Sequence, residues 1–133
     1  MMKDVLSEKI RILLVDDNPI NRKLAKIHLD KYGHEIEMAV NGLESVEKFR
    51  DNEYDLILMD INMPVMDGIQ ATKEIREVEK GDSKRKRTSI IAVTANAFVD
   101  NKDQCLKSGM DAYLSKPFRP EDLVQTINLL RAG

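Results

Sequence analysis

The chain has 133 residues, of which 42% are hydrophobic and 33% charged, and its formal net charge is −2 at pH 7. This length suits one domain, the hydrophobic content is enough for a packed core, and the negative charge argues against general binding of nucleic acid through phosphate contacts. No apolar run could span a bilayer, the N-terminus lacks the apolar core of a secretory signal, and the single cysteine excludes an internal disulfide, so we expect a cytoplasmic protein.

Five short apolar runs of strand length alternate with amphipathic segments. These segments lie at residues 12–15, 35–40, 55–59, 90–93 and 111–115, and the second alternates in the manner of a strand. After the first run, Asn18-Pro19 is typical of a helix start, because asparagine caps free N–H groups and proline at the first helical position already has a helical φ. The apolar residues that follow at helical spacing are Ile20, Leu24 and Ile27. Gly33 is placed to end this helix in a left-handed conformation.

Four more helices are predicted between and after the later runs. The second is expected to open at Asn41. The third opens at Asp67, which is interpreted as an N-cap and not as part of an Asp-Gly hairpin, because apolar residues follow it at helical intervals. The fourth passes through Phe98 and stops at Gly109, and the fifth begins at Pro120.

This alternation predicts one α/β domain over residues 1–133, with its core at about residues 10–131. Continuous apolar strands separated by helices are typical of a parallel sheet covered on both faces. We expect a (βα)₅ arrangement with the flavodoxin-like strand order 2-1-3-4-5. In such sheets, ligands bind outside the carboxyl ends of the strands, where the strand order reverses.

The most informative polar residues fall at those carboxyl ends. They are Asp16 and Asp17 after the first strand, Asp60 after the third, Thr94 after the fourth and Lys116 after the fifth. In the order 2-1-3-4-5 the first and third strands are neighbours. The three aspartates are therefore expected to meet in one pocket, with Thr94 and Lys116 on its far side.

Three carboxylates in one pocket repel each other, by about 4 kcal/mol for two charges about 4 Å apart at an effective dielectric of about 20. Such a cluster takes up protons or binds a hard cation, Mg²⁺ first, with Mn²⁺ as an alternative. With the cation bound, a carboxylate can attack phosphorus, and Asp60 is the best candidate because it is single and central. Thr94 can donate a hydrogen bond to a phosphoryl oxygen, and Lys116 can pair with another.

Four segments together resemble the response regulator receiver family. They are Val-Asp-Asp-Asn at residues 15–18, Leu-Met-Asp-Ile-Asn-Met-Pro-Val-Met-Asp-Gly at 58–68, Val-Thr-Ala-Asn-Ala at 93–97 and Ser-Lys-Pro-Phe at 115–118. The match runs from about Ile10 to Leu130, with the motifs in the family's order. The resemblance implies a receiver domain of a two-component or phosphorelay system.

The resemblance also implies roles for single residues at the site. Asp60 would be the phosphorylation site. Asp17 and Asp60 would ligate Mg²⁺ directly, together with the backbone carbonyl of Asn62. Asp16 would act on the ion through a water molecule.

A conformational switch is the other implication of the resemblance. Thr94 and Lys116 would hold the phosphoryl group, Tyr113 would swing inward as Thr94 is drawn to the phosphate, and the Lys116-Pro117 bond would be cis. The protein would be a signalling switch and not a metabolic enzyme, catalysing only its own phosphorylation and dephosphorylation. Phosphate would come from a histidine kinase or a histidine phosphotransfer protein, and an effector would dock on the fourth helix, fifth strand and fifth helix.

Other interpretations stay open on the residues alone. One is a receiver-like adaptor that takes no phosphate. A weaker one is a phosphohydrolase of the haloacid dehalogenase type, which needs an acid two residues after its first-strand nucleophile, where this chain has Asn18. We expect no nucleic-acid partner, because no second domain follows in this sequence. Met1 and the short leading segment favour a free-standing regulator, whereas residues 93–98 resemble receivers fused to hybrid kinases.

The remaining motifs have ordinary interpretations. The basic run at residues 84–87 is interpreted as a solvated loop, with a docking patch as the sharper alternative. His28 and His34 have no partner at useful spacing and are interpreted as surface or packing residues. Cys105 is interpreted as a small apolar core residue.

Overall fold

The computed structural model describes residues 9–95, 102–116 and 118–132, and in these ranges five parallel strands form one sheet in the order β2-β1-β3-β4-β5. The strands are β1 (Arg11–Val15), β2 (Glu35–Ala39), β3 (Leu56–Asp60), β4 (Ser89–Thr94) and β5 (Ala112–Ser115). The helices are α1 (Pro19–Asp30), α2 (Gly42–Asp51), α3 (Gly68–Lys80), α4 (Lys102–Ser108) and α5 (Pro120–Ala132). The predicted (βα)₅ fold and its strand order are confirmed.

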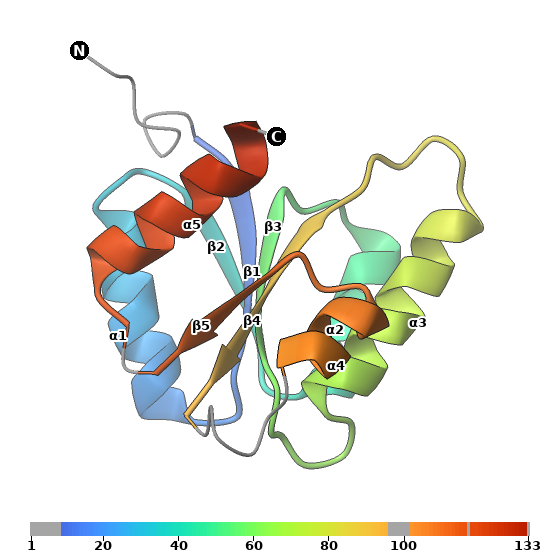
Figure 1. Cartoon of the computed structure of the whole chain (residues 1–133), viewed down its shortest axis with the longest axis horizontal. Coiled ribbons are helices and arrows are strands. Elements are labelled where there is room, and N and C mark those ends of the chain that lie inside the picture. The colour runs from blue at the N-terminus through green and yellow to red at the C-terminus, as the bar shows by residue number, and fades with distance from the viewer. Residues whose placement is uncertain (1–8, 96–101, 117, 133) are drawn as a thin grey trace.

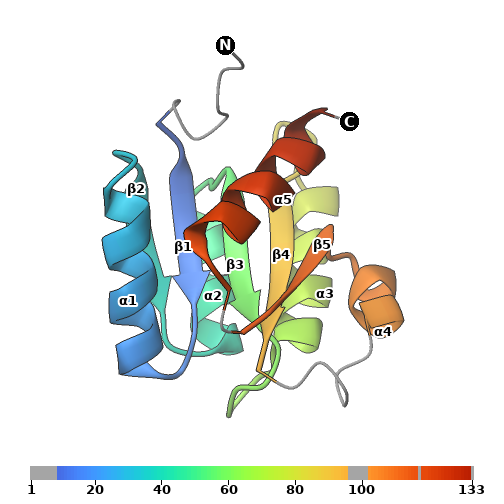
Figure 2. The same cartoon turned by 60° about the vertical axis from the view of Figure 1, so that its left-hand side comes forward.

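Helices cover both faces of the sheet. Helices α1 and α5 lie on one face and α2, α3 and α4 on the other (Figures 1 and 2). Residues alternate between the two cores along each strand: Leu13 packs with the α2 and α3 side chains, and Leu14 packs with those of α1 and α5. All five residues of the central strand β3 are buried, which explains why its first four residues form a continuous apolar run.

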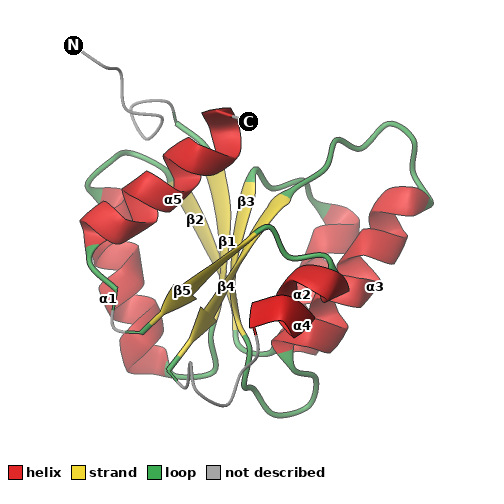
Figure 3. Cartoon of the chain, in the orientation of Figure 1, coloured by secondary structure: helices red, strands yellow, loops and turns green. Residues whose placement is uncertain are grey.

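The helix starts follow the predicted capping residues. The Asn18 side chain accepts hydrogen bonds from the backbone N–H groups of Ile20 and Asn21 at the start of α1. Asn41 caps α2 and Asp67 caps α3, each through a 2.8 Å bond from the backbone N–H three residues on. The loops that follow β1, β2 and β3 gather at one edge of the sheet, the lower edge in Figure 3.

The apolar stripe that predicts α1 is not its buried face. Ile20, Leu24 and Ile27 are 68%, 53% and 48% exposed, whereas Leu29 on the opposite side of the helix is 1% exposed. Gly33, with φ +79°, ends the segment in the predicted left-handed conformation. The stripe is therefore a surface feature that lies next to the loop after β1.

Two predictions fall partly on residues outside the described ranges. The expected start of the fourth helix, with Phe98 and Val99, lies outside them, and α4 is described only from Lys102. Pro117 is also outside, so the predicted cis bond that precedes it stays a prediction. Gly109, with φ +114°, follows α4 at the predicted stop.

The basic run at residues 84–87 is anchored to the domain. The Arg85 guanidinium lies 4.6 Å from the centre of the Phe49 ring and donates hydrogen bonds to the carbonyls of Arg50 and Asn52. Its side chain is only 10% exposed, so the interpretation as a solvated loop is wrong for this residue. The neighbouring Lys86 and Arg87 pair with carboxylates of the same domain.

The remaining cysteine and histidine interpretations concern packing. Cys105 is fully buried in the core on the α2 and α3 side. His34 is 6% exposed, and its Nδ1 accepts a 3.1 Å hydrogen bond from the N–H of Ile10, while His28 is exposed on α1. None of the helices in the described ranges combines the length and apolar character that crossing a membrane requires.

Candidate functional site

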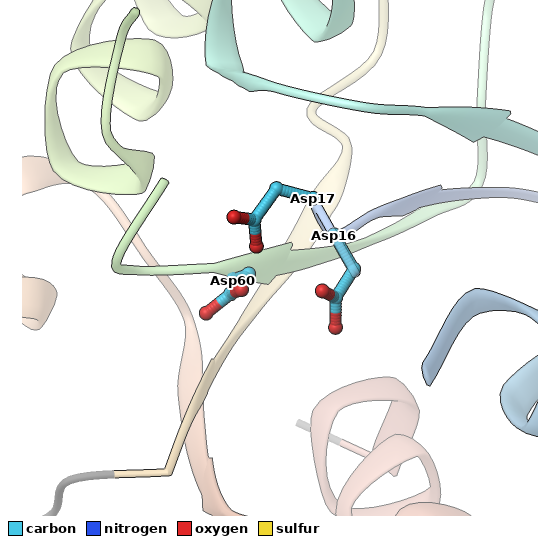
Figure 4. Close-up of side chains that lie close together, drawn as sticks. All are labelled: Asp16, Asp17 and Asp60. Carbon is cyan, nitrogen blue, oxygen red and sulfur yellow. The ribbon is translucent and has the colours of Figure 1, made fainter. Parts of the chain in front are cut away.

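Three aspartates meet at the carboxyl ends of the two central strands. Asp16 and Asp17 follow β1, and Asp60 is the last residue of the adjacent β3, where Val15 pairs with Met59. One carboxylate oxygen of each residue lies within 4.8 Å of the others (Figure 4). Asp16 and Asp60 are buried and Asp17 is exposed. The predicted acidic cluster is therefore present, open to solvent on the Asp17 side.

Lys116 pairs with two of the three aspartates. It follows β5, and its ammonium lies 2.8 Å from Asp16 Oδ2 and 3.5 Å from Asp60 Oδ2. Its backbone N–H donates to the carbonyl of Thr94, which anchors the residue to the end of β4. The cluster thus brings together three carboxylates and one ammonium from the described residues. Two negative charges remain uncompensated.

Burial raises the pKa of the Asp60 carboxyl from 3.8 to about 6. The Lys116 ammonium lowers this pKa, the Asp16 carboxylate raises it, and the hydrogen bond from the Asn62 N–H lowers it, but the loss of hydration dominates. In metal-free protein the site therefore takes up a proton at mildly acidic pH.

We expect the contribution of Asp60 to the stability of the metal-free protein to fall as the pH rises from about 4 to about 7. The folded state holds the Asp60 proton up to about pH 6, whereas the unfolded chain releases it near 3.8. Stability from this group is full below about pH 4 and is lost as the pH rises through about 6. The loss is on the order of 3 kcal/mol, at about 1.4 kcal/mol for each pKa unit.

Urea unfolding in a chelating buffer across this pH range measures the effect. Asp60→Asn is the reference because its amide does not titrate, so the difference between the two proteins isolates Asp60. Equal pH dependence of the two free energies of unfolding would contradict the raised pKa.

Two glycines lock the loop that follows Asp60. A Cβ on Gly68 would lie 2.2 Å from the carbonyl oxygen of Asp60, and a Cβ on Gly42 would lie 2.3 Å from that of Met66. The two N–H groups donate to the carbonyls of Ile61 and Met66 respectively. The helices α2 and α3 thus start in direct backbone contact with the loop. The sequence analysis did not identify Gly42 or Gly68 as site residues, although each directly follows a helix-capping residue.

The same loop carries strained backbone at its exposed tip. Val65 has φ +71°, and the N–H of Met66 donates to the carbonyl of Pro64, 2.8 Å away. An i to i+2 hydrogen bond around a residue with this φ forms a γ-turn, which is rare and strained, the more so for a β-branched residue. The Val65 side chain is 75% exposed at this turn.

Thr94 and Tyr113 lie on neighbouring strands. Thr94 ends β4 and is fully buried, and it pairs in register with Ser115. Tyr113 is half-buried on β5 and packs against the core on the α2 and α3 side. The strand order therefore places both residues as the sequence analysis expects, while their roles in a switch stay predictions.

The chemistry of the cluster fits a hard divalent cation. The side-chain atoms that could ligate a metal at the three acidic positions are all carboxylate oxygens, the ligands that Mg²⁺ prefers. One divalent ion would neutralise the two charges that Lys116 leaves uncompensated. The exposure of Asp17 would also leave room for the waters that Mg²⁺ usually retains. Asn62 is exposed at the start of the loop and could add its backbone carbonyl.

Comparison with known proteins gives consistent matches. The family model for the response regulator receiver domain matches residues 12–128. A probable histidine kinase of Oryza sativa subsp. indica is 37% identical over 148 residues, which cover 91% of this chain and 15% of that protein. The chain therefore spans only a small part of that kinase's length.

Solved structures agree in fold. The receiver domain of the sensor histidine kinase PA1611 from Pseudomonas aeruginosa, with a magnesium ion coordinated in its active-site cleft, superposes with a TM-score of 0.83 at 37% identity, covering 95% of this chain and all of that one. The Saccharomyces cerevisiae Ssk1 receiver domain, crystallised with the histidine phosphotransfer protein Ypd1, gives a TM-score of 0.82 at 36% identity, covering 90% and 87% of the two chains.

Proposed function

Because this chain belongs to the response regulator receiver family, we propose that it takes a phosphoryl group from a phosphohistidine donor onto Asp60 with the help of Mg²⁺. The observation that carries the proposal is the cluster of three aspartates, two of which, Asp16 and Asp60, pair with Lys116. The family's members are parts of signalling proteins, so the chain acts as a switch whose only catalysis is of its own phosphorylation and dephosphorylation.

Each residue of the cluster has its own role in phosphoryl transfer. An oxygen of the Asp60 carboxylate attacks phosphorus as the bond from phosphorus to the donor histidine nitrogen breaks, and the electron pair stays with that nitrogen. The ammonium of Lys116 pairs with one phosphoryl oxygen, and the hydroxyl of Thr94 donates to another. Mg²⁺, when bound by Asp17, Asp60 and the Asn62 carbonyl, with Asp16 acting through water, would neutralise charge on the transferring group; Mn²⁺ offers similar coordination.

The response to phosphate is a shift between two conformations. Lys116 is held by Asp16 before transfer, and a phosphoryl group on Asp60 offers it a new partner. Thr94 moves toward the phosphoryl group, and Tyr113 follows inward on the adjacent strand. Only one conformation makes these contacts, so phosphorylation favours it and alters the face made by α4, β5 and α5, where we place the effector.

The donor docks beside the exposed stripe of α1. Ile20, Leu24 and Ile27 form an exposed apolar row along α1, which begins directly after the loop that carries Asp16 and Asp17. Leu24 also lines a cavity of about 290 Å³ that lies between α1 and α5 and reaches the site. A stripe of this kind fits an amphipathic helix of a histidine kinase or a histidine phosphotransfer protein.

Leu24→Asp should slow phosphotransfer from a protein donor by about tenfold or more, because central apolar anchors typically contribute over about 1–2 kcal/mol of binding energy. Uptake from acetyl phosphate should not change, since that donor needs no docking surface. Leu129→Asp, the same change at an exposed leucine on α5, is the control and should behave as wild type in both assays. Equal rates for Leu24→Asp and wild type with the protein donor would contradict docking on α1.

The proposed function is tested by incubating the chain and Mg²⁺ with a radiolabelled, phosphorylated histidine phosphotransfer protein. Label should move to the chain, and a chelator should prevent the transfer. A folded, Mg²⁺-binding chain that stays unlabelled with this donor and with acetyl phosphate would favour the phosphate-independent adaptor instead. The phosphohydrolase alternative is weakened further because Asn18, at the position that its general acid would need, is used as a helix cap.

We place this activity in the cytoplasm. Cys105 is the single cysteine of the sequence and is buried, so the chain forms no internal disulfide, as suits a reducing compartment.

A further inference from the structure

The Arg22 side chain on α1 contacts the loop after β1, which carries Asp16 and Asp17. One guanidinium nitrogen, Nη1, donates a 2.6 Å hydrogen bond to the backbone carbonyl oxygen of Asp16. The residue is half-buried, and its donor is ionised, so this bond is stronger than an ordinary neutral one. The contact spans the turn that joins β1 to α1.

Every polar group of Asp16 is held by a different part of the fold. Its N–H donates to Ala39 on β2, its Oδ1 accepts from the N–H of Asn18, and its Oδ2 accepts from Lys116. Its carbonyl is the group that Arg22 holds. Asp17 differs, because its exposed carboxylate has no hydrogen bond or ion pair to any other described residue.

The carbonyl that Arg22 holds determines where Asp17 points. The Asp16 carbonyl and the Asp17 N–H belong to one planar peptide group. Holding the oxygen restricts rotation of that plane about the Asp16 Cα–C bond, and so restricts the position of the Asp17 Cα from which the side chain leaves. Contacts with Arg22 therefore orient a carboxylate that has no tether of its own among the described residues.

We infer that Arg22 is a positioning residue for the metal site, orienting Asp17 through the Asp16–Asp17 peptide without touching the ion. This inference rests on the proposed function, because it assumes that Asp17 is a Mg²⁺ ligand. Residues that orient metal ligands typically contribute about tenfold or more to metal affinity. The sequence gives Arg22 only as one of several basic residues on α1, so the contact itself is what distinguishes it.

Charge and geometry predict opposite outcomes for Arg22→Ala. Removing a positive charge near three carboxylates would by itself strengthen binding of a cation. Releasing the peptide plane would weaken binding, because Asp17 must then be ordered when the ion binds. The direction of the change in Mg²⁺ affinity therefore separates positioning from a charge effect.

Calorimetric titration of the full chain with Mg²⁺ at pH 7.5 and low temperature tests the inference, with circular dichroism to confirm that each variant is folded. Arg22→Ala should bind Mg²⁺ about tenfold more weakly than wild type. Arg22→Lys should recover part of the loss, because an ammonium can still donate to the Asp16 carbonyl. Lys23→Ala removes the same charge from the adjacent, exposed position and should not weaken binding.

The outcomes distinguish this inference from the proposed function. If wild type binds Mg²⁺ and Arg22→Ala binds it equally well or more tightly, the positioning role is wrong. The assignment of the metal site would be unaffected. Loss of affinity in Arg22→Ala that Arg22→Lys fails to recover at all would also overturn it. A wild-type chain that binds no Mg²⁺ would overturn the metal site, and the role of Arg22 with it.

Discussion

Asp60→Asn should give a folded protein that takes up no phosphoryl group from any donor. The amide keeps the shape of the carboxyl but is a far weaker nucleophile. The substitution also removes the negative charge of one carboxylate from the cluster. Asp60 is 6% exposed at the centre of the site, and the remaining acids have other partners or face solvent. The loss should therefore be complete, measured as label transferred from acetyl phosphate and from a phosphorylated protein donor.

The control for this variant is Asp51→Asn, a matched change at the exposed end of α2. It should take up label at the wild-type rate. The free energy of unfolding of Asp60→Asn in metal-free buffer at pH 7 should be equal to that of wild type or higher, since the mutation removes a buried charge. Label on another residue of Asp60→Asn would mean that the phosphorylation site has been assigned wrongly.

Gly68→Ala should damage both the fold and the site. The new Cβ would lie 2.2 Å from the Asp60 carbonyl oxygen and 3.0 Å from the Ile61 Cα, which are backbone atoms that no side-chain rotation can move. Relief requires α3 or the end of β3 to shift. We expect the free energy of unfolding to fall by about 3 kcal/mol, at the upper end for overpacking, and phosphorylation to slow by about 100-fold, because Asp60 is displaced.

Gly81→Ala, at the other end of α3, is the matched control. A Cβ there would meet its nearest neighbours at 3.6 and 3.7 Å, which is ordinary contact, and the residue has a right-handed helical conformation. Its free energy of unfolding should stay within about 0.5 kcal/mol of wild type. Denaturant unfolding and acetyl phosphate labelling measure both effects, and a Gly68→Ala protein that matches Gly81→Ala in both would refute the close-contact argument.

The fold could be predicted from sequence because its signals are local. The central strand is buried on both faces and so reads as a continuous apolar run, and the caps Asn18, Asn41 and Asp67 mark helix starts through bonds to residues two or three positions away. Asp16, Asp17 and Asp60 come together because the carboxyl ends of neighbouring parallel strands share one edge of the sheet.

What could not be predicted depends on contacts between separate elements of the fold, which neither a cap nor a periodicity records. The periodicity of α1 identifies a helix but not which side of it the sheet covers, so the exposure of Leu24 had to be observed. In the sequence, Arg85 is part of a basic run that suggests a solvated loop. Its contact with the Phe49 ring is visible only in the structure. Gly68 and Arg22 likewise act through backbone atoms of other segments, and no sequence pattern records such contacts.

The most direct test of the central claim is intact-mass spectrometry of wild type and Asp60→Asn after incubation with acetyl phosphate, with and without Mg²⁺. We predict one phosphoryl adduct on the wild-type chain, stable in acid and labile in base, that requires both Mg²⁺ and Asp60. An adduct that forms equally well without Mg²⁺ or on Asp60→Asn, or no adduct on folded, Mg²⁺-bound wild type, would contradict the proposed switch chemistry.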